Sequence, residues 1–165
     1  MLEKIISGGQ TGADIAALDV ALHYDFPHGG WCPKARLSLD GPIPEKYQLI
    51  ETPSAGYPQR TEWNVRDSDG TVVFTFAKEA TGGSLKTIRL AKKHAKPCLH
   101  ISRGMYDSSE RIIKFVDEND IRVLNVAGSR ESKEPGIHDW VEGLLSYAFF
   151  WSEDHPGVLG GPGEG

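Results

Sequence analysis

The 165-residue chain has little of several features that would assign it to a specialised class of protein. Its two cysteines, Cys32 and Cys98, are too few for a disulfide framework, so we expect a reducing, cytoplasmic setting. It has no run of about 18 apolar residues, so no transmembrane helix is predicted, and its first residues lack the pattern of a signal peptide. None of the six histidines is placed with a cysteine at zinc spacing, which predicts no metal site.

The chain also has no excess of basic charge. Its formal net charge is −5 at pH 7, which disfavours broad nucleic-acid binding because that usually requires a basic face. A small anionic ligand remains compatible with an acidic protein, since a few backbone amides and one or two arginines can bind a phosphate. With 39% hydrophobic and 25% charged residues, the composition is that of a globular protein rather than a disordered one.

What the sequence does contain is an alternation of two kinds of segment. Short apolar runs rich in β-branched residues predict strands buried on both faces, and segments with helical spacing of apolar residues separate them. The predicted strands are residues 3–7, 47–51, 71–76, 97–102 and 121–126, and the predicted helices are residues 13–23, 58–67, 83–94, 108–119 and 137–151. The alternation predicts a three-layer α/β fold with a five-stranded parallel sheet between helices.

Two regions interrupt this alternation. Residues 26–44 form a long connection rich in glycine and proline, and loops of that length in compact domains are often functional. The chain ends in SEDHPGVLGGPGEG, which is also rich in glycine and proline. We therefore expect one domain over residues 1–151 and a flexible tail over residues 152–165.

The last predicted helix is unusually aromatic. Its large aromatic residues are Trp140, Tyr147, Phe149, Phe150 and Trp151. Core packing explains part of this set, and a surface shared between copies of the chain would explain the surplus. We therefore expect a homodimer or a larger homo-oligomer.

Three glycines within five positions follow the first predicted strand, in IISGGQTGAD, residues 5–14. Glycine lets the backbone approach a ligand closely, and the next helix presents unpaired N–H groups and the positive end of its dipole. Such a turn is a typical phosphate site, although glycines can also serve only to make a tight turn. The spacing is neither a P-loop nor G-x-G-x-x-G. The candidate ligand-binding residues are Gly8, Gly9, Gln10, Thr11, Gly12, Ala13 and Asp14, the last of which could also cap the helix or accept from a ribose-like hydroxyl.

Two further loops repeat the pattern of strand, glycine and hydroxyl. The third predicted strand is followed by ATGGSLKT, residues 80–87, and the fifth ends in NVAGSRES, residues 125–132. Loops at the carboxyl ends of parallel strands lie at one edge of the sheet, where ligands bind. Three convergent loops favour a phosphate-binding site over three unrelated turns. They add Thr81, Gly82, Gly83, Ser84, Gly128, Ser129 and Arg130 to the candidates.

The three loops resemble those of the SLOG superfamily, the Rossmann-like group that includes the LOG phosphoribohydrolases and the DprA and YpsA proteins. In those relatives a Gly-Ser-Arg motif usually follows the first strand, whereas here AGSRES follows the last. That order is similar to the circularly permuted YpsA-like branch, whose members bear the name of molybdenum carrier proteins. The likeness covers residues 4–151 and includes the long string over residues 30–74, with departures at Ala35, Leu37 and Leu39.

The resemblance implies a strand order and further contacts. Moving the first strand of the Rossmann order 3-2-1-4-5 to the end of the chain gives 2-1-5-3-4, which makes the strands before the three glycine loops adjacent. On the second predicted helix the resemblance implies ligand contacts from Arg60, Thr61 and Asn64, where the alternative is a solvated face. In the long connection it leaves Lys34 and Arg36 as possible contacts.

Three functions fit these patterns. The first is a binding protein for a phosphate-bearing nucleotide-like or pterin ligand; by resemblance it would carry molybdenum cofactor, a pterin with a terminal phosphate. The second is a LOG-like phosphoribohydrolase, which cleaves a nucleotide and needs a placed carboxylate. In the LOG pattern a glutamate follows the Pro-Gly-Gly-x-Gly-Thr turn, whereas here the helix continues Ile88-Arg89-Leu90-Ala91, so binding is favoured over catalysis. The third is an oligomeric structural module with a relict site. The expected partners are a small phosphorylated ligand and copies of the chain, without nucleic acid or membrane.

Overall fold

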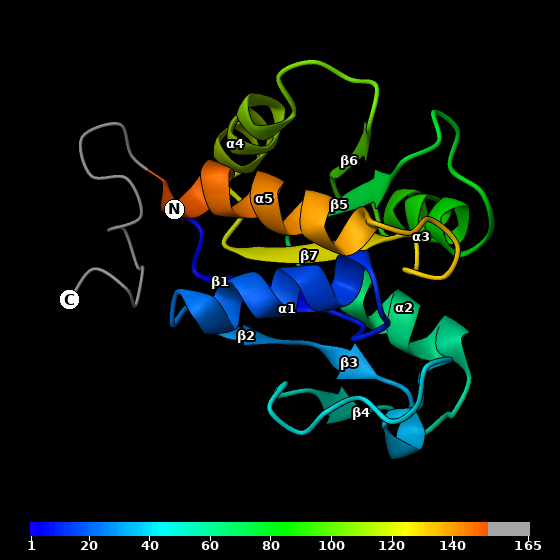
Figure 1. Ribbon diagram of the computed structural model, residues 1–165. Coiled ribbons are helices and arrows are strands. Elements are labelled where there is room, and N and C mark those ends of the chain that lie inside the picture. Colours follow the sequence, from blue (N-terminus) through cyan, green and yellow to red (C-terminus); the bar gives the residue numbers. More distant parts are fainter. Residues whose placement is uncertain (152–165) are drawn as a thin grey trace.

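The fold is built on a sheet of five parallel strands, in the order β2-β1-β7-β5-β6 (Figure 1). We describe residues 1–151 of it from a computed structural model; the predicted tail, residues 152–165, lies outside the described residues. The strands are β1 (Lys4–Ser7), β2 (His28–Gly29), β5 (Gly70–Thr75), β6 (Cys98–Ser102) and β7 (Val123–Gly128). The predicted α/β class and its five-stranded parallel sheet are therefore confirmed.

Helices cover both faces of this sheet. The helices are α1 (Ala13–His23), α2 (Tyr57–Arg66), α3 (Gly82–Lys93), α4 (Ser108–Glu118) and α5 (Ile137–Phe150). The connections from β1 to β2 and from β5 to β6 run in opposite directions across the sheet, so right-handed crossovers place α1 and α3 on opposite faces. Accordingly, α5 packs between α1 and α4 on one side, while α2 packs against α3 on the other (Figure 1).

The main core lies between the sheet and the α1, α4 and α5 layer. Phe74 and Leu124 from the central strands and Leu145 from α5 are fully buried in it. Continuous burial along β5 explains why its sequence, GTVVFT, contains no charged residue and does not alternate between apolar and polar positions. Over residues 1–151, no helix has both the length and the apolar character needed to cross a bilayer.

The aromatic residues of α5 and of its C-cap, Trp151, divide between the core and the surface. Phe150 is buried and stacks on Tyr24, and Trp140 packs edge-on against Phe74. Tyr147 and Trp151 are instead 44% and 38% exposed and stack on one another. The homo-oligomer remains a prediction, and these two rings are the exposed aromatic surface it would use.

One predicted strand lies elsewhere than expected. The observed order matches 2-1-5-3-4 except at the edge beside β1, where β2 stands in place of residues 47–51. Residues Ile50–Glu51 form β4, which pairs with β3 (Trp31–Cys32) in a separate two-stranded sheet. Gly30 separates β2 from β3: its φ is +128° and a Cβ there would lie 2.2 Å from the Ser7 carbonyl oxygen. The chain bends away from β1 at this residue, and a two-residue strand has no periodicity by which to recognise it.

A short 3-10 turn, η1 (Lys34–Arg36), and the irregular segment that follows it fill the space between β3 and β4. This connection is anchored by its own small core, in which Ile43 and Tyr47 pack with Cys32 against Leu18 of α1. The long glycine- and proline-rich segment is therefore packed onto α1 by apolar contacts rather than standing free in solvent.

Candidate functional site

The three glycine loops meet at the carboxyl edge of the sheet, because β1, β7 and β5 are neighbours. Between these loops, α2 and α3 lies a cleft of about 380 Å³, a volume typical of small-molecule sites. The sequence-predicted residues that line it are Gly8, Gln10, Asp14, Arg60, Thr61, Asn64, Gly82, Gly83, Ser84, Gly128, Ser129 and Arg130.

Seven predicted residues do not line the cleft. They are Gly9, Thr11, Gly12, Ala13, Lys34, Arg36 and Thr81. Gly9 instead packs beneath Ile43 and Leu49, and the Thr11 hydroxyl donates to Asp40 at 2.8 Å. Gly9 and Thr11 thus contact the long connection instead of the cleft.

Arg36 has a structural role in the long connection. Its guanidinium donates to the backbone carbonyls of Ile43, Pro44 and Tyr47, at 2.9, 2.8 and 2.7 Å. Backbone carbonyls in an irregular segment need donors, and a guanidinium supplies several in a fixed geometry. The prediction that Arg36 faces the ligand therefore finds no support in its placement, and the neighbouring Lys34 is exposed away from the cleft.

The backbone groups of the loop after β1 mainly contact other residues of the chain. Gly12 caps α1 with φ +90°, and a Cβ there would lie 2.4 Å from the Ser129 carbonyl oxygen. That same oxygen accepts the Ala13 N–H at 3.2 Å, so the first and third loops pack backbone against backbone. The Gln10 N–H donates to the Asp14 carboxylate at 3.2 Å, which closes the turn.

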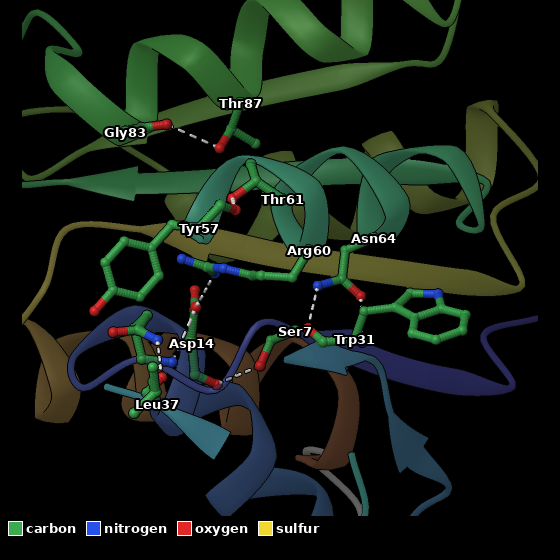
Figure 2. Close-up of polar contacts among 11 residues, drawn as sticks. Ser7, Asp14, Trp31, Leu37, Tyr57, Arg60, Thr61, Asn64, Gly83 and Thr87 are labelled. Atoms are coloured by element: carbon green, nitrogen blue, oxygen red, sulfur yellow. Dashed lines mark hydrogen bonds and ion pairs between the residues drawn. The ribbon is translucent and has the colours of Figure 1, made fainter. Parts of the chain in front are cut away.

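Asp14 and Arg60 form a buried ion pair in the cleft (Figure 2). Arg60 Nη1 lies 3.1 Å from Asp14 Oδ2, and the two side chains are 14% and 6% exposed. Arg60 lies directly against Gly8, where a Cβ would be 1.9 Å from Nη1, so only glycine leaves room for it. Burial raises the pKa of Asp14, while the charge of Arg60 opposes that shift.

One nitrogen of this pair is unsatisfied. Arg60 Nε is buried and has no hydrogen-bond partner among residues 1–151. A buried donor without an acceptor is costly, at about 1–3 kcal/mol. An acceptor atom of a ligand, or an ordered water, reaching Nε would remove that penalty.

The other two predicted residues of α2 are engaged within the protein. Asn64 accepts from the Trp31 N–H at 2.8 Å and donates to the Trp31 carbonyl at 2.9 Å, as Figure 2 shows. The Thr61 hydroxyl donates to the Tyr57 carbonyl one turn earlier. Both line the cleft, but Asn64 mainly holds the start of β3 in place.

The start of α3 is open. Its N-cap residue Thr81 makes no capping hydrogen bond, and within residues 1–151 the amides of Gly82, Gly83 and Ser84 donate to no protein acceptor. Lys133 Nζ donates to the Thr81 hydroxyl at 2.8 Å, which places a cation beside these amides. Free amides at a helix N-terminus with a neighbouring cation form an anion site.

The third loop contains an anion supplied by the protein. The carboxylate of Glu134 accepts from the N–H groups of Phe76 and Ala77, each at 2.9 Å, and from the hydroxyl of Ser129. Burial alone would raise the pKa of Glu134, but the hydrogen bonds from Ser129, Phe76 and Ala77 hold it below its ordinary value. The hydroxyl of Ser129, a predicted phosphate contact, is thus bound to Glu134.

Eight lining residues were not predicted from the sequence. They are Tyr57, Pro58, Lys86, Thr87, Asn125, Val126, Ala127 and Lys133. The sequence held a signal for two of them. Lys86 lies three residues after the predicted Gly83, and Lys133 lies three residues after the predicted Arg130, so each could reach the same side of its loop. Tyr57 and Pro58 reach the cleft only because α2 packs against α3, which no local pattern reveals.

Comparisons with known proteins show the family of this chain. Residues 5–149 match the model of the circularly permutated YpsA SLOG family. The crystal structure of a "putative molybdenum carrier protein" from Syntrophus aciditrophicus SB is similar, with a TM-score of 0.85 and 45% sequence identity. The match covers 89% of this chain and 94% of that chain. A search of the curated proteins found no match. Because the family model spans nearly all of the described chain, this protein belongs to the circularly permutated YpsA branch of the SLOG family.

Proposed function

We propose that this chain binds a small phosphate-bearing ligand, a nucleotide or a pterin, in the cleft between its glycine loops, and that it carries this ligand rather than converting it. The observation that carries the proposal is the open start of α3. Free amides of Gly82, Gly83 and Ser84 lie beside Lys133, and Lys86 and Arg130 line the same cleft. A phosphate offers several acceptor oxygens and two negative charges to such a set.

The rest of the cleft suits a heterocyclic ring. Tyr57 and Ala127, which line the cleft and are partly exposed, supply apolar surface. The Asp14–Arg60 pair supplies an acceptor next to donors, including the unsatisfied Nε of Arg60. Nucleobases and pterins combine apolar faces with an edge of donors and acceptors, and so match both parts.

The solved relative supports the pterin among these ligands. It bears the name of a molybdenum carrier, and molybdenum cofactor is a pterin with a terminal phosphate. At 45% identity over most of both chains, a shared ligand class is a reasonable basis for experiment. We therefore place a pterin phosphate beside nucleoside monophosphates as a ligand to test.

Hydrolysis is the second candidate, and Asp14 is the residue that favours it. Asp14 is the one carboxylate among the described residues that line the cleft, and a raised pKa is typical of a general acid. However, Asp14 is paired with Arg60 and accepts the Gln10 N–H, which leaves it poorly placed to transfer a proton. Release of free base from a nucleoside monophosphate during incubation with the protein would favour the hydrolase over the carrier.

Calorimetric titration with AMP, GMP and a pterin phosphate tests the proposal, with molybdate as a small oxyanion that has no ring. Arg130→Ala should weaken binding of the phosphorylated ligand at least about tenfold, since a charge-assisted hydrogen bond contributes about 1.5–3 kcal/mol. Arg89→Ala is the matched control, because Arg89 is exposed on α3 but does not line the cleft. Equal affinity in both variants, or no binding of any of these compounds, would contradict the proposal.

A second variant tests the amides themselves. A Cβ on Gly83 would meet no atom within 4 Å, so Gly83→Val should not disturb the empty protein. Gly83 lines the cleft, and the added side chain should hinder the approach of a phosphate to the first turn of α3. We expect at least as large a loss of affinity as for Arg130→Ala, with an unchanged melting temperature.

A further inference from the structure

A second cluster of chemically active side chains lies where α1 packs against α5. It consists of Asp19 on α1 and His138 and Glu142 on α5, none of which lines the cleft. His138 Nε2 is 2.7 Å from Asp19 Oδ2 and 3.9 Å from Glu142 Oε2. His138 and Glu142 are one helical turn apart and therefore share a face of α5.

The separations suit a small divalent cation. The three donor atoms all lie within 4.8 Å of one another. Zinc binds nitrogen and oxygen ligands at about 2.0–2.2 Å, so two ligands of a tetrahedral site lie about 3.3–3.6 Å apart. The observed 2.7 and 3.9 Å bracket that range, and side-chain shifts of under about 1 Å would bring the donors to it.

Neighbouring groups orient the donors and leave an excess of negative charge. The Tyr47 hydroxyl donates to Asp19 Oδ1 at 2.5 Å, and His138 Nδ1 lies 3.0 Å from Asp139 Oδ1. Partners of this kind fix the orientation of metal-binding carboxylates and imidazoles. Three carboxylates surround one imidazole, so the cluster is net negative even when the imidazole is protonated. A divalent cation would neutralise that excess.

We propose that Asp19, His138 and Glu142 bind a divalent transition-metal ion such as Zn²⁺, with water completing the coordination. The donors are reachable, since their side chains are 26–46% exposed. An imidazole with carboxylates suits zinc and its neighbours better than Mg²⁺ or Ca²⁺, which prefer oxygen alone. The bound ion joins α1 to α5 and, through Tyr47, to the long connection. This site does not depend on the function proposed for the cleft.

The alternative is a metal-free ion pair between His138 and Asp19, whose atoms are already in contact. Glu142 separates the two possibilities. At 3.9 Å from Nε2 it makes no hydrogen bond to His138, so a simple ion pair hardly needs it, whereas a metal site does. Glu142→Gln keeps the shape of the side chain and removes the charge.

The test is titration of Zn²⁺ into the full chain after removal of metals with a chelator, followed by calorimetry and a thermal melt. We expect one saturable site per chain, loss of that site in His138→Ala, and at least a tenfold weaker site in Glu142→Gln. Glu3→Gln, at an exposed glutamate outside the cluster, should bind as the unmodified chain. Absence of zinc binding would overturn the proposal, and so would binding that is unchanged by Glu142→Gln. Binding that is unchanged by His138→Ala would also overturn it, because the ion would then be bound at another site. If His138→Ala fails to fold, the comparison of Glu142→Gln with Glu3→Gln decides.

Discussion

The loops after β1 and β5 share a pattern of strand, paired glycines and helix, yet they differ in almost every contact. In the first, Gly8, Gly9 and Gly12 are buried, and an added Cβ would collide with neighbouring atoms. In the second, Gly82 and Gly83 are exposed, and a Cβ on Gly83 would meet nothing within 4 Å. The first loop packs against the rest of the protein, and the second presents free amides. A glycine motif alone therefore does not distinguish a packing role from a ligand-binding role.

The largest effect that would sharpen this comparison is expected at Gly12. Gly12→Val should reduce the free energy of unfolding by roughly 2–5 kcal/mol, because it adds backbone strain at φ +90° to a collision with the Ser129 carbonyl. Urea unfolding followed by circular dichroism measures the change. A reduction in the free energy of unfolding of less than about 1 kcal/mol would mean that the first loop tolerates a side chain as the second does, and would contradict the difference between the two loops.

Glu134 should give an intermediate effect, since it anchors the beginning of the second loop. Glu134→Gln should lower the free energy of unfolding by about 1–2 kcal/mol at pH 7, because the carboxylate accepts from Phe76, Ala77 and Ser129. The pKa of Glu134 is lowered in the folded protein, so its contribution is complete above the ordinary value of 4.5 and is lost as the pH falls through the folded value. The two proteins should therefore converge in stability in acid.

Urea unfolding over a pH series measures this convergence. Glu45→Gln, at an exposed glutamate directly after the long connection, is the charge-matched control and should change little. A constant difference between Glu134→Gln and the unmodified chain at all pH values would show that the carboxylate charge is not what anchors the loop.

The smallest effect is expected at Gly83. Gly83→Ala should change the free energy of unfolding by less than about 0.5 kcal/mol, toward greater stability, because alanine suits a helix better and meets no neighbour. A thermal melt is sufficient to detect a departure. Clear destabilisation by Gly83→Ala would show that the second loop, like the first, makes contacts that stabilise the fold.

The sequence predicted the parts of the molecule that depend on local patterns. The helix over residues 13–23 was placed to the residue, and the central strands within one or two residues, because each is a short, mainly apolar segment with a glycine at one boundary. The two-residue strand β2 was missed, since it has no period of its own. The adjacency of the three loops was predicted only with the aid of the permuted strand order.

Contacts between residues that are far apart in the sequence could not be predicted from local patterns. Asp14 and Arg60 are 46 positions apart, and only the packing of α2 across the sheet edge brings them together. Arg36 was named as a possible ligand contact from the resemblance, and no local pattern indicated that its guanidinium would donate to the backbone carbonyls of Pro44 and Tyr47. Glu134 and Ser129 are close in sequence, yet their partners Phe76 and Ala77 are not.

The place of β1 in the sheet also bears on how the protein is made. β1 pairs with β7, Lys4 opposite Val123, so β1 leaves the ribosome about 119 residues (123 − 4) before its partner strand. At about 5–20 residues per second, it waits roughly 6–24 seconds for that partner. During this time β1 has only the two-residue β2 beside it, and the β5–β6 pair forms separately. The edge of β1 that will pair with β7 thus stays open until residues 123–126 are made, and an open strand edge is a template for pairing with other nascent chains.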